Sequence, residues 1–434
     1  MSESAAIAQS NTPSGRRVWL RRPAVWIPAS LIVIAGLVAA GMLLQVRAEL
    51  TEARRHMGFG DFEEARACID SFLKWFPAST EAHMLAAEVA IKDESLHSDA
   101  ALSAALGHLR KIPDSDQLAS RARIQEARIY LFLMDMPGRA EERLQKAIQL
   151  DSSTAEPYYL MWKLMDLTGR SFYAEEFFIQ TYLFSPTELK PVRLREWYMS
   201  QFYPATANPT LDRLMQVTSG YQPSGAVSEL RRFERFVAAE PTNPANSAII
   251  ARWYLLDGSP RDSLKFLKDA MPETVEPLQD STFISTLINT LYDLGEFQQA
   301  WQFYEQWAPE DSYEYHRWTA ILEDDVRENR TAALAAYDRA LSKWPGPADW
   351  RMMFRKANCL VQLGRTDEGN QIRKKAQQVE AMMEEDIHRP LRNALAAPDD
   401  PDTIQSMIDL YDQLEMQLES GFWRSELSRV ATNN

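Results

Sequence analysis

The sequence predicts an all-α protein, a solenoid of about nine helix pairs that follows one N-terminal transmembrane helix. Three observations carry this prediction. Apolar residues beyond position 50 recur at the three- and four-residue spacing of amphipathic helices, with almost no strand signal. A phrase built from Gly, a small residue and Pro returns along the chain at a nearly constant interval. Residues 24–46 contain no charged side chain.

Composition restricts the class of protein further. The chain has 434 residues, of which 45% are hydrophobic, so it can bury a substantial core. Its net charge of −14 argues against general nucleic-acid binding, because an acidic surface repels phosphate backbones. Cys68 and Cys359 are the only cysteines, which excludes a disulfide framework and a CxxC metal or redox site. We expect both to be free thiols.

The uncharged segment Ala24–Val46 is 23 residues long, enough for a helix to cross a bilayer. Trp19 and Trp26 lie where an interfacial aromatic belt is expected. The arginines before the segment favour a cytoplasmic tail over residues 1–23. We therefore expect a single-pass inner or plasma membrane protein with a periplasmic or other extracytoplasmic domain. The alternative is a cleaved signal peptide, although the apolar run exceeds the usual length of one.

The recurring phrase reads GDFEEARACIDSFLKWFP from Gly60 to Pro77 and GEFQQAWQFYEQWAP from Gly295. In each copy a small residue near the start of the second helix of a pair is followed four positions later by a larger apolar one. Seven of the nine intervals between successive copies lie between 33 and 39 residues. The positions of the small residue are Ala65, Ala101, Ala140, Ala174, Glu229, Ser263, Ala300, Ala333, Gly369 and Glu426.

This register has a physical interpretation. A glycine tolerates the left-handed conformation at which a helix ends, and we expect it at Gly60, Gly169, Gly258, Gly295 and Gly364. The small residue then lets the two helices of a pair approach closely. Proline ends the second helix, since it cannot continue one. One pair cannot bury its apolar face alone, so neighbouring pairs stack and complete the core.

A period near 34 with this Gly–Ala–Pro pattern resembles the tetratricopeptide repeat family. The resemblance implies a TPR-like α-solenoid in a membrane-anchored protein of bacterial type. Glu229 and Glu426 depart from the pattern, as does Trp162, which stands where the family prefers Gly or Ala. The expected organisation is a first repeat block over 47–186, an irregular helical insertion over 187–225, a second block over 226–381 and capping helices over 382–434.

The resemblance also implies that a protein segment binds in the concave groove of the solenoid. For Trp318 both a core position and a groove position remain open. Ser285 stands where a carboxylate clamp would need Lys, so we do not expect that clamp. By the repeat register, the residues that face the groove are Arg252, Asn289, Tyr292, Trp318, Arg351 and Asn358.

No catalytic signature accompanies these repeats. The chain has no GxxxxGK[ST], HExxH or GxSxG motif, and Glu384 with His388 lacks a third metal ligand. We therefore expect no metal, cofactor or catalytic residue, and a non-enzymatic scaffold for a cell-envelope complex. One alternative is an accessory or catalytic subunit of envelope glycan or lipid processing, with its chemistry around Arg193–Pro223. Another is a homo-oligomeric structural protein. An enzyme should show a deep pocket with converging titratable groups, and a scaffold a long open groove.

Overall fold

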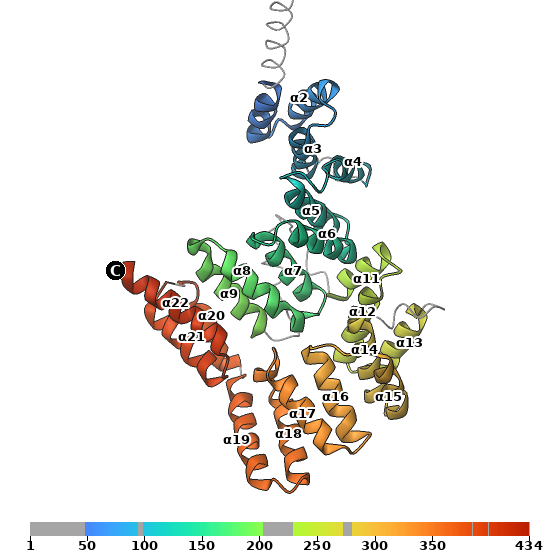
Figure 1. Cartoon of the computed structure of the whole chain (residues 1–434), viewed down its shortest axis with the longest axis vertical. Helices are drawn as coiled ribbons and strands as arrows, with labels where there is room; N and C mark the ends of the chain where they lie inside the picture. The colour runs from blue at the N-terminus through green and yellow to red at the C-terminus, as the bar shows by residue number, and fades with distance from the viewer. Residues whose placement is uncertain are drawn as a thin grey trace, which may run out of the picture. The chain divides into compact units, whose positions relative to one another are not determined.

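The computed structural model describes residues 48–93, 99–202, 229–271, 280–383, 385–397 and 399–433. Every regular element in these residues is helical (Figure 1). The chain divides into two compact units, residues 1–111 and 112–434. The predicted membrane segment Ala24–Val46 lies outside the described residues, and none of the helices within them has the length and apolar character needed to span a bilayer.

The first unit contains two helix pairs. The first described helix covers residues 48–59 and pairs with α2 (Phe62–Trp75), and α3 (Thr80–Lys92) pairs with α4 (Asp99–Arg110). Ser79 begins α3 as an N-cap, because its hydroxyl accepts a hydrogen bond from the Ala82 amide at 3.3 Å. The core between these helices is apolar and consists of Leu50, Ala53, Ala65, Ile69, Phe72, Ala82, Leu85 and Val89.

The second unit continues the pattern of paired helices. The pairs are α5 (Ala119–Arg128) with α6 (Pro137–Leu150), α7 (Ala155–Leu167) with α8 (Ala174–Phe184), α12 (Pro244–Leu256) with α13 (Pro260–Ala270), α14 (Ser281–Asp293) with α15 (Phe297–Gln306), α16 (Tyr313–Asp325) with α17 (Arg330–Leu341), α18 (Trp350–Gln362) with α19 (Thr366–Met382), and α21 (Pro401–Gln413) with α22 (Gln417–Asn433). The other helical elements are η2 (Ile129–Leu133), η3 (Ser171–Tyr173), η4 (Thr187–Leu189), α9 (Lys190–Gln201), α11 (Glu229–Ala239), η6 (Gly346–Ala348) and α20 (Glu385–Ala394).

The turns inside the pairs have the conformation that the sequence predicts. All five expected glycines have a positive φ, between 65° and 83°. At Gly60 the turn is closed by a hydrogen bond from the Asp61 amide to the His56 carbonyl at 2.9 Å. Gly adopts this conformation at little cost, although Asp135, Glu328 and Glu415 also adopt it before α6, α17 and α22.

The close-contact positions also follow the predicted register, with one shift. Ala65, Ala140, Ala174, Ala300 and Ala333 are fully buried. Ala101 is only partly buried, and Ala105 takes the close-contact position one turn later. The reason is that α4 begins at Asp99, so Ala101 still lies in its first turn.

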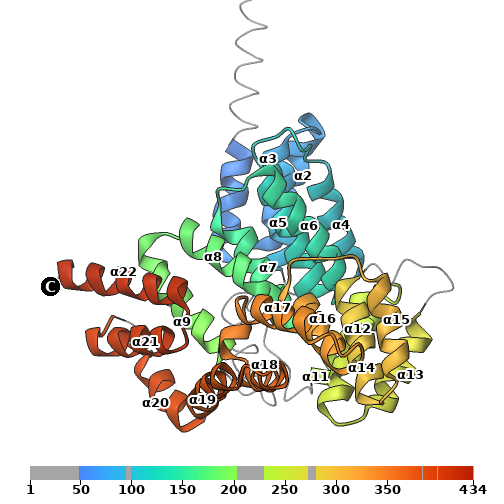
Figure 2. The same cartoon turned by 60° about the horizontal axis from the view of Figure 1, so that its bottom comes forward.

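The C-terminal helices pack against α8 and α9, through contacts that span 190 to 244 residues of the chain. Figures 1 and 2 show α9 beside α20 and α22 in both views. The rings of Tyr182 and Phe422 lie 4.1 Å apart, and the Tyr411 hydroxyl donates to the Gln201 side chain at 2.7 Å. The segment that the sequence predicts as a cap therefore also closes a contact of long sequence range.

Trp162 departs from the family pattern because α9 covers α7. Its ring is fully buried and meets those of Phe178 and Trp197 edge-on, at centroid distances of 5.5 and 5.6 Å. In an ordinary repeat this position faces a second helix closely and needs a small residue. Here the added layer leaves room for an indole, and the aromatic cluster fills it.

Candidate functional site

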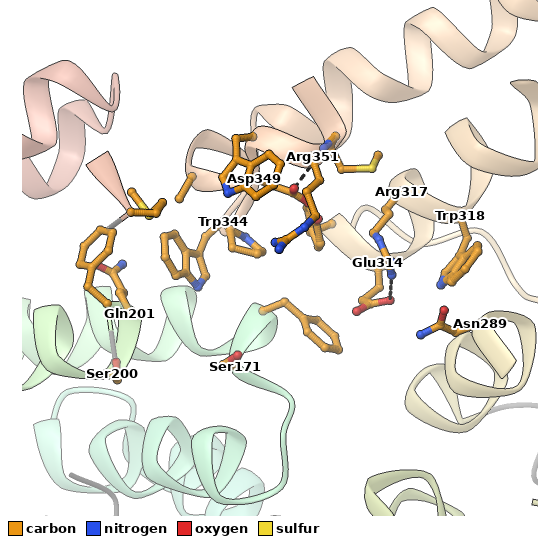
Figure 3. Close-up of a pocket in the computed structure, with 18 of the residues that line it drawn as sticks. Ser171, Ser200, Gln201, Asn289, Glu314, Arg317, Trp318, Trp344, Asp349 and Arg351 are labelled. Atoms are coloured by element: carbon orange, nitrogen blue, oxygen red, sulfur yellow. Dashed lines mark hydrogen bonds and ion pairs between the residues drawn. The ribbon is translucent and has the colours of Figure 1, made fainter. Parts of the chain in front are cut away.

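The second unit contains a cavity of about 880 Å³ between its repeats and the covering helix α9. One side is lined by α14, α16 and the segment from Trp344 to the start of α18. The opposite side is lined by the α7–η3 turn and by α9, and the ends of α19 and α20 complete the wall. Figure 3 shows side chains from these elements directed toward a common space. A volume of this size suits a small molecule or a short peptide segment.

Four of the six sequence-predicted binding residues meet at this cavity: Asn289 and Tyr292 from α14, Trp318 from α16 and Arg351 from α18. The repeat register places them together because α14, α16 and α18 are the first helices of successive pairs. Arg252 and Asn358 do not line the cavity.

Trp318 belongs both to the core and to the cavity wall. Its side chain is 1% exposed and packs against Tyr292, with ring centroids 5.6 Å apart. Its indole Nε1 has no hydrogen-bond partner within the described residues. A buried N–H without an acceptor costs free energy, and this N–H is covered by the protein rather than exposed to the cavity.

Arg252 is occupied by contacts within the chain. Its guanidinium donates to Thr286 Oγ1 and Ser285 Oγ at 2.8 Å each, and to the Gly169 carbonyl at 3.0 Å. It also lies over the Phe172 ring, 4.9 Å from the centroid. The α7–η3 turn therefore covers the groove at α12, and the predicted open groove is partly closed by the chain itself.

Asn358 is exposed on α18 and accepts a hydrogen bond from Arg373 at 3.0 Å. It borders a separate pocket of about 330 Å³, together with Asp324, Arg330 and Gln362. Arg355 lines both this pocket and the larger cavity, whereas Asn358 lines only the smaller one.

Most charged side chains around the cavity are paired. Glu314 lies 3.8 Å from Arg252 and 3.7 Å from Arg317, and Arg355 lies 2.9 Å from Asp325. Opposite charges at these distances hold each other in place. These residues form the frame of the site.

Asp349 and Arg351 close the α18 side of the cavity. The Asp349 carboxylate accepts from the Met352 amide at 3.0 Å, so it caps α18, and it also accepts from the Tyr313 hydroxyl. Arg351 is exposed and lies over the Trp350 ring at 4.2 Å, and no ion pair is recorded for it in the described part of the chain. Its guanidinium can bind an anionic group.

A buried ionisable cluster lies at the α7–α9 edge of the cavity. Lys163 Nζ is 3.8 Å from Glu196, which also pairs with Arg193 at 2.9 Å. Burial lowers the pKa of Lys163, and burial raises the pKa of Asp166, which lines the cavity, to about 7. A carboxyl with a pKa near 7 can take up and release protons at neutral pH, a property shared by catalytic groups and by structural networks.

Sequence reasoning missed four aromatic residues of the cavity wall. Trp197 and Phe202 come from α9 and its end, on one side, and on the other side Trp344 precedes α18 and Trp350 begins it. None of the four follows the repeat period. The available signal was the run of aromatics in the interruption after position 187, whose residues 203–225 lie outside the described part.

The structure describes only the histidine of the Glu384–His388 pair. His388 is buried; its Nδ1 is 2.9 Å from the Tyr198 hydroxyl, and its ring stacks on Phe202 at 4.8 Å. Glu384 lies outside the described residues. Among the residues that are described, no three His, Cys, Asp or Glu side chains gather closely enough to hold a metal ion.

The fold defines an all-helical solenoid of helix pairs, and comparison with known families agrees. The family described as "Tetratricopeptide repeat" matches residues 50–116 and 325–369. These two segments therefore resemble tetratricopeptide repeats. No curated protein matches it.

Several solved structures are similar to this chain. The TPR domain of P58(IPK) is 14% identical, covers 89% of this chain and 98% of its own, and has a TM-score of 0.25. Pseudomonas aeruginosa pilF is 15% identical over 52% of this chain and 93% of its own, with a TM-score of 0.25. The APC/C hetero-tetramer Cut9–Hcn1 is 11% identical over 88% of this chain and 86% of its own, with a TM-score of 0.37. Because these scores lie below 0.5, the fold assignment here rests on the helix pairs and the repeat match.

Proposed function

We propose that this protein is a membrane-anchored, non-enzymatic scaffold that holds a short segment of a partner protein in the cavity of its second unit. Tetratricopeptide-repeat proteins bind protein partners, and the cavity is where four predicted binding residues converge. Because the α7–η3 turn covers the groove at α12, the segment binds in the space between α14, α16 and α18. This convergence is the single observation that carries the proposal.

The cavity supplies three kinds of contact for such a segment. The Asn289 amide, which lines the cavity, can bind backbone carbonyls. Arg351 can bind a carboxylate or a chain terminus. The Trp350 ring beside it offers apolar area for a side chain.

The test is co-purification of the partner from detergent-solubilised membranes with single variants. Arg351→Ala and Asn289→Ala should lose the partner, because both side chains line the cavity. Trp318→Phe keeps most of the buried ring and removes only a covered N–H, so partner recovery and the melting temperature should both stay close to those of the native chain. Trp318→Ala is not suitable, because it would empty the core.

Asn358→Ala is the matched control, since Asn358 is exposed on the same helix as Arg351 but lies outside the cavity. Full recovery of the partner with every cavity variant would reject the cavity as the binding site. Loss of the partner with Asn358→Ala alone would indicate that the partner binds at the smaller pocket.

We further propose that Ala24–Val46 anchors the protein in an inner or plasma membrane with the repeats outside the cytoplasm, as part of an envelope complex. The uncharged length of this segment and the arginines before it support this orientation. A single reporter cysteine at exposed Thr432, in a chain with Cys68→Ser and Cys359→Ala, should react with an impermeant thiol reagent in intact cells. Reaction only after lysis would reverse the orientation.

One observation favours the enzymatic alternative, a catalytic or accessory subunit of envelope glycan or lipid processing. Asp166 lines the cavity with a pKa of about 7, and Lys163 lies on the same face of α7 one turn earlier. If the cavity performs proton transfer, Asp166→Asn should abolish turnover without loss of partner binding. If partner binding is the function, Asp166→Asn should leave recovery of the partner unchanged.

A further inference from the structure

An exposed aromatic surface lies at one end of the first helix pair. Lys74, Trp75, Phe76, Pro77 and Ala78 are all exposed, at the end of α2 and just beyond it. The Trp75 side chain is 66% exposed and Phe76 is 36% exposed. Exposure of two adjacent aromatic side chains to water is unfavourable, so this surface is a candidate contact for another molecule or for a membrane.

The pairing of the helices shows which end of the first unit this surface occupies. Helix 48–59 and α2 run antiparallel, because a turn at residues 57–61 joins them and Ser71 Oγ donates to Glu49 Oε1 at 3.3 Å. Leu50 and Phe72 belong to the same buried cluster. Trp75 is therefore at the end where helix 48–59 begins. Phe59, which is 75% exposed, is at the opposite end, roughly 16 Å away along the helix axis.

Helix 48–59 begins two residues after the 23-residue uncharged segment ends at Val46. If that segment spans the bilayer, as proposed above, the end of the pair that carries Trp75 and Phe76 starts at the membrane surface. The opposite end, with Phe59, is held away from it. The position of the uncharged segment Ala24–Val46 in the sequence therefore indicates that the membrane surface lies next to the aromatic surface.

The chemistry of this surface fits the lipid–water interface. Trp is enriched there because its ring is apolar and its indole N–H remains hydrated. Lys74 is exposed and can extend its ammonium group to lipid phosphates. Glu49, on the neighbouring helix 48–59, accepts a hydrogen bond from the Ser71 hydroxyl at 3.3 Å.

We propose that Lys74, Trp75 and Phe76 form an interfacial membrane contact that sets the first helix pair against the bilayer surface. The contact rests on the proposed membrane anchor, but it is a separate property: the anchor tethers the chain, and this surface orients the first repeat. The occupant is the headgroup region of the bilayer that the anchor crosses.

The test uses the full chain reconstituted into vesicles of phosphatidylcholine with a minority of phosphatidylglycerol. In a Cys68→Ser, Cys359→Ala background, one variant carries Trp75→Cys and a matched variant carries Phe59→Cys, each labelled with an environment-sensitive fluorophore. Lipids with a spin label near the headgroup serve as the quencher. Both native residues are exposed, so neither change empties the core.

The expected result is quenching several-fold stronger at position 75 than at position 59. Equal, weak quenching at both positions in protein that floats with the vesicles would overturn the contact and leave the anchor standing. A label at 75 that is shielded from water but not quenched would show that protein, such as a second copy of the chain, covers the surface, which also overturns the proposal. Protein that fails to float would overturn the anchor and this contact together.

Discussion

At the scale of single residues, the small side chain at each helix crossing decides how closely a pair can approach. Ala300 in α15 is fully buried and belongs to a core with Leu267, Leu291 and Trp307. The larger members of that core fill the space around it, and little room remains for added atoms. The same holds for Ala65 in the first unit.

Ala300→Phe should therefore lower the free energy of unfolding by on the order of 1–3 kcal/mol through overpacking. The measurement is urea unfolding followed by circular dichroism. Ala335→Phe is the control, because Ala335 is exposed on α17 and the larger ring can remain in water. Equal effects of the two changes would mean that Ala300 does not lie at a close helix–helix contact.

At the scale of elements, two pairs of helices are in contact through ionisable side chains. Their contributions to stability have opposite pH dependence. In the first unit, His83 of α3 and His108 of α4 approach with their Nδ1 atoms 2.9 Å apart. His83 Nε2 lies 2.9 Å from the Pro77 carbonyl and donates to it, so His83 Nδ1 accepts and His108 Nδ1 donates. The contact requires a neutral His83, because a protonated His83 has no nitrogen left to accept the hydrogen bond.

Burial lowers the pKa of both His83 and His108, and Lys111 lowers it further. Because the folded pKa lies below the ordinary value of 6.5, the contribution of the contact is complete above that value and is lost as pH falls below it. The amide protection factors in α3 and α4, which are corrected for the intrinsic pH dependence of exchange, should fall as pH decreases from about 7.5 to about 5.5, and His108→Gln should flatten this dependence. Identical profiles for both proteins would count against the pair.

In the second unit, Glu419 of α22 is buried against α9 and accepts from Trp197 Nε1 at 3.4 Å. Burial, followed by the nearby carboxyl of Glu175, raises its pKa from 4.5 to about 7. The protonated form is therefore favoured in the folded state. The stabilisation is complete below about pH 4.5 and is lost as pH rises toward the folded pKa.

Glu419→Gln should stabilise the second unit at about pH 8, by up to roughly 3 kcal/mol for a pKa shift of this size, because Gln keeps the acceptor and removes the charge. Chemical unfolding at about pH 5 and about pH 8 measures it. Asp409→Asn on the exposed face of α21 serves as the control. A variant that is no more stable than the native chain at the higher pH would show that Glu419 ionises without cost.

At the scale of the second unit as a whole, the packing of α22 on α8 and α9 changes how the solenoid unfolds. Repeats that contact only their neighbours unfold with limited cooperativity. Here Tyr182 contacts Phe422, 240 positions away, through their rings and through a hydrogen bond to the Phe422 carbonyl at 3.4 Å. The C-terminal pair is thereby coupled to α8 as well as to its own neighbours.

Phe422→Ser should break this coupling, so a single unfolding transition of the second unit should separate into two. Thermal unfolding followed both by circular dichroism and by tryptophan fluorescence would resolve them. Leu418→Ser on the same helix is the matched control, since Leu418 is 43% exposed. Coincident transitions in Phe422→Ser would show that the long-range contact adds no cooperativity.

The sequence by itself determined the helix pairs, their turns and their close-contact residues. Gly295 and Ala300 are readable because they depend on local conformation and on a repeated packing geometry, and both recur with the period of the unit. For the same reason the register identified Asn289, Tyr292, Trp318 and Arg351 as neighbours on successive first helices. Periodicity carries this information without any long-range contact.

Only the tertiary structure decided that the groove is a cavity. The α7–η3 turn accepts a hydrogen bond from Arg252. Trp197 of α9 and Trp344 line the cavity together, and the repeat pattern does not predict this. Contacts such as Tyr182–Phe422 join residues whose spacing follows no period. Such contacts depend on how the non-repetitive segments fold back on the solenoid. That is set by the summed burial and hydrogen bonding of many side chains, and no local pattern in the sequence records it.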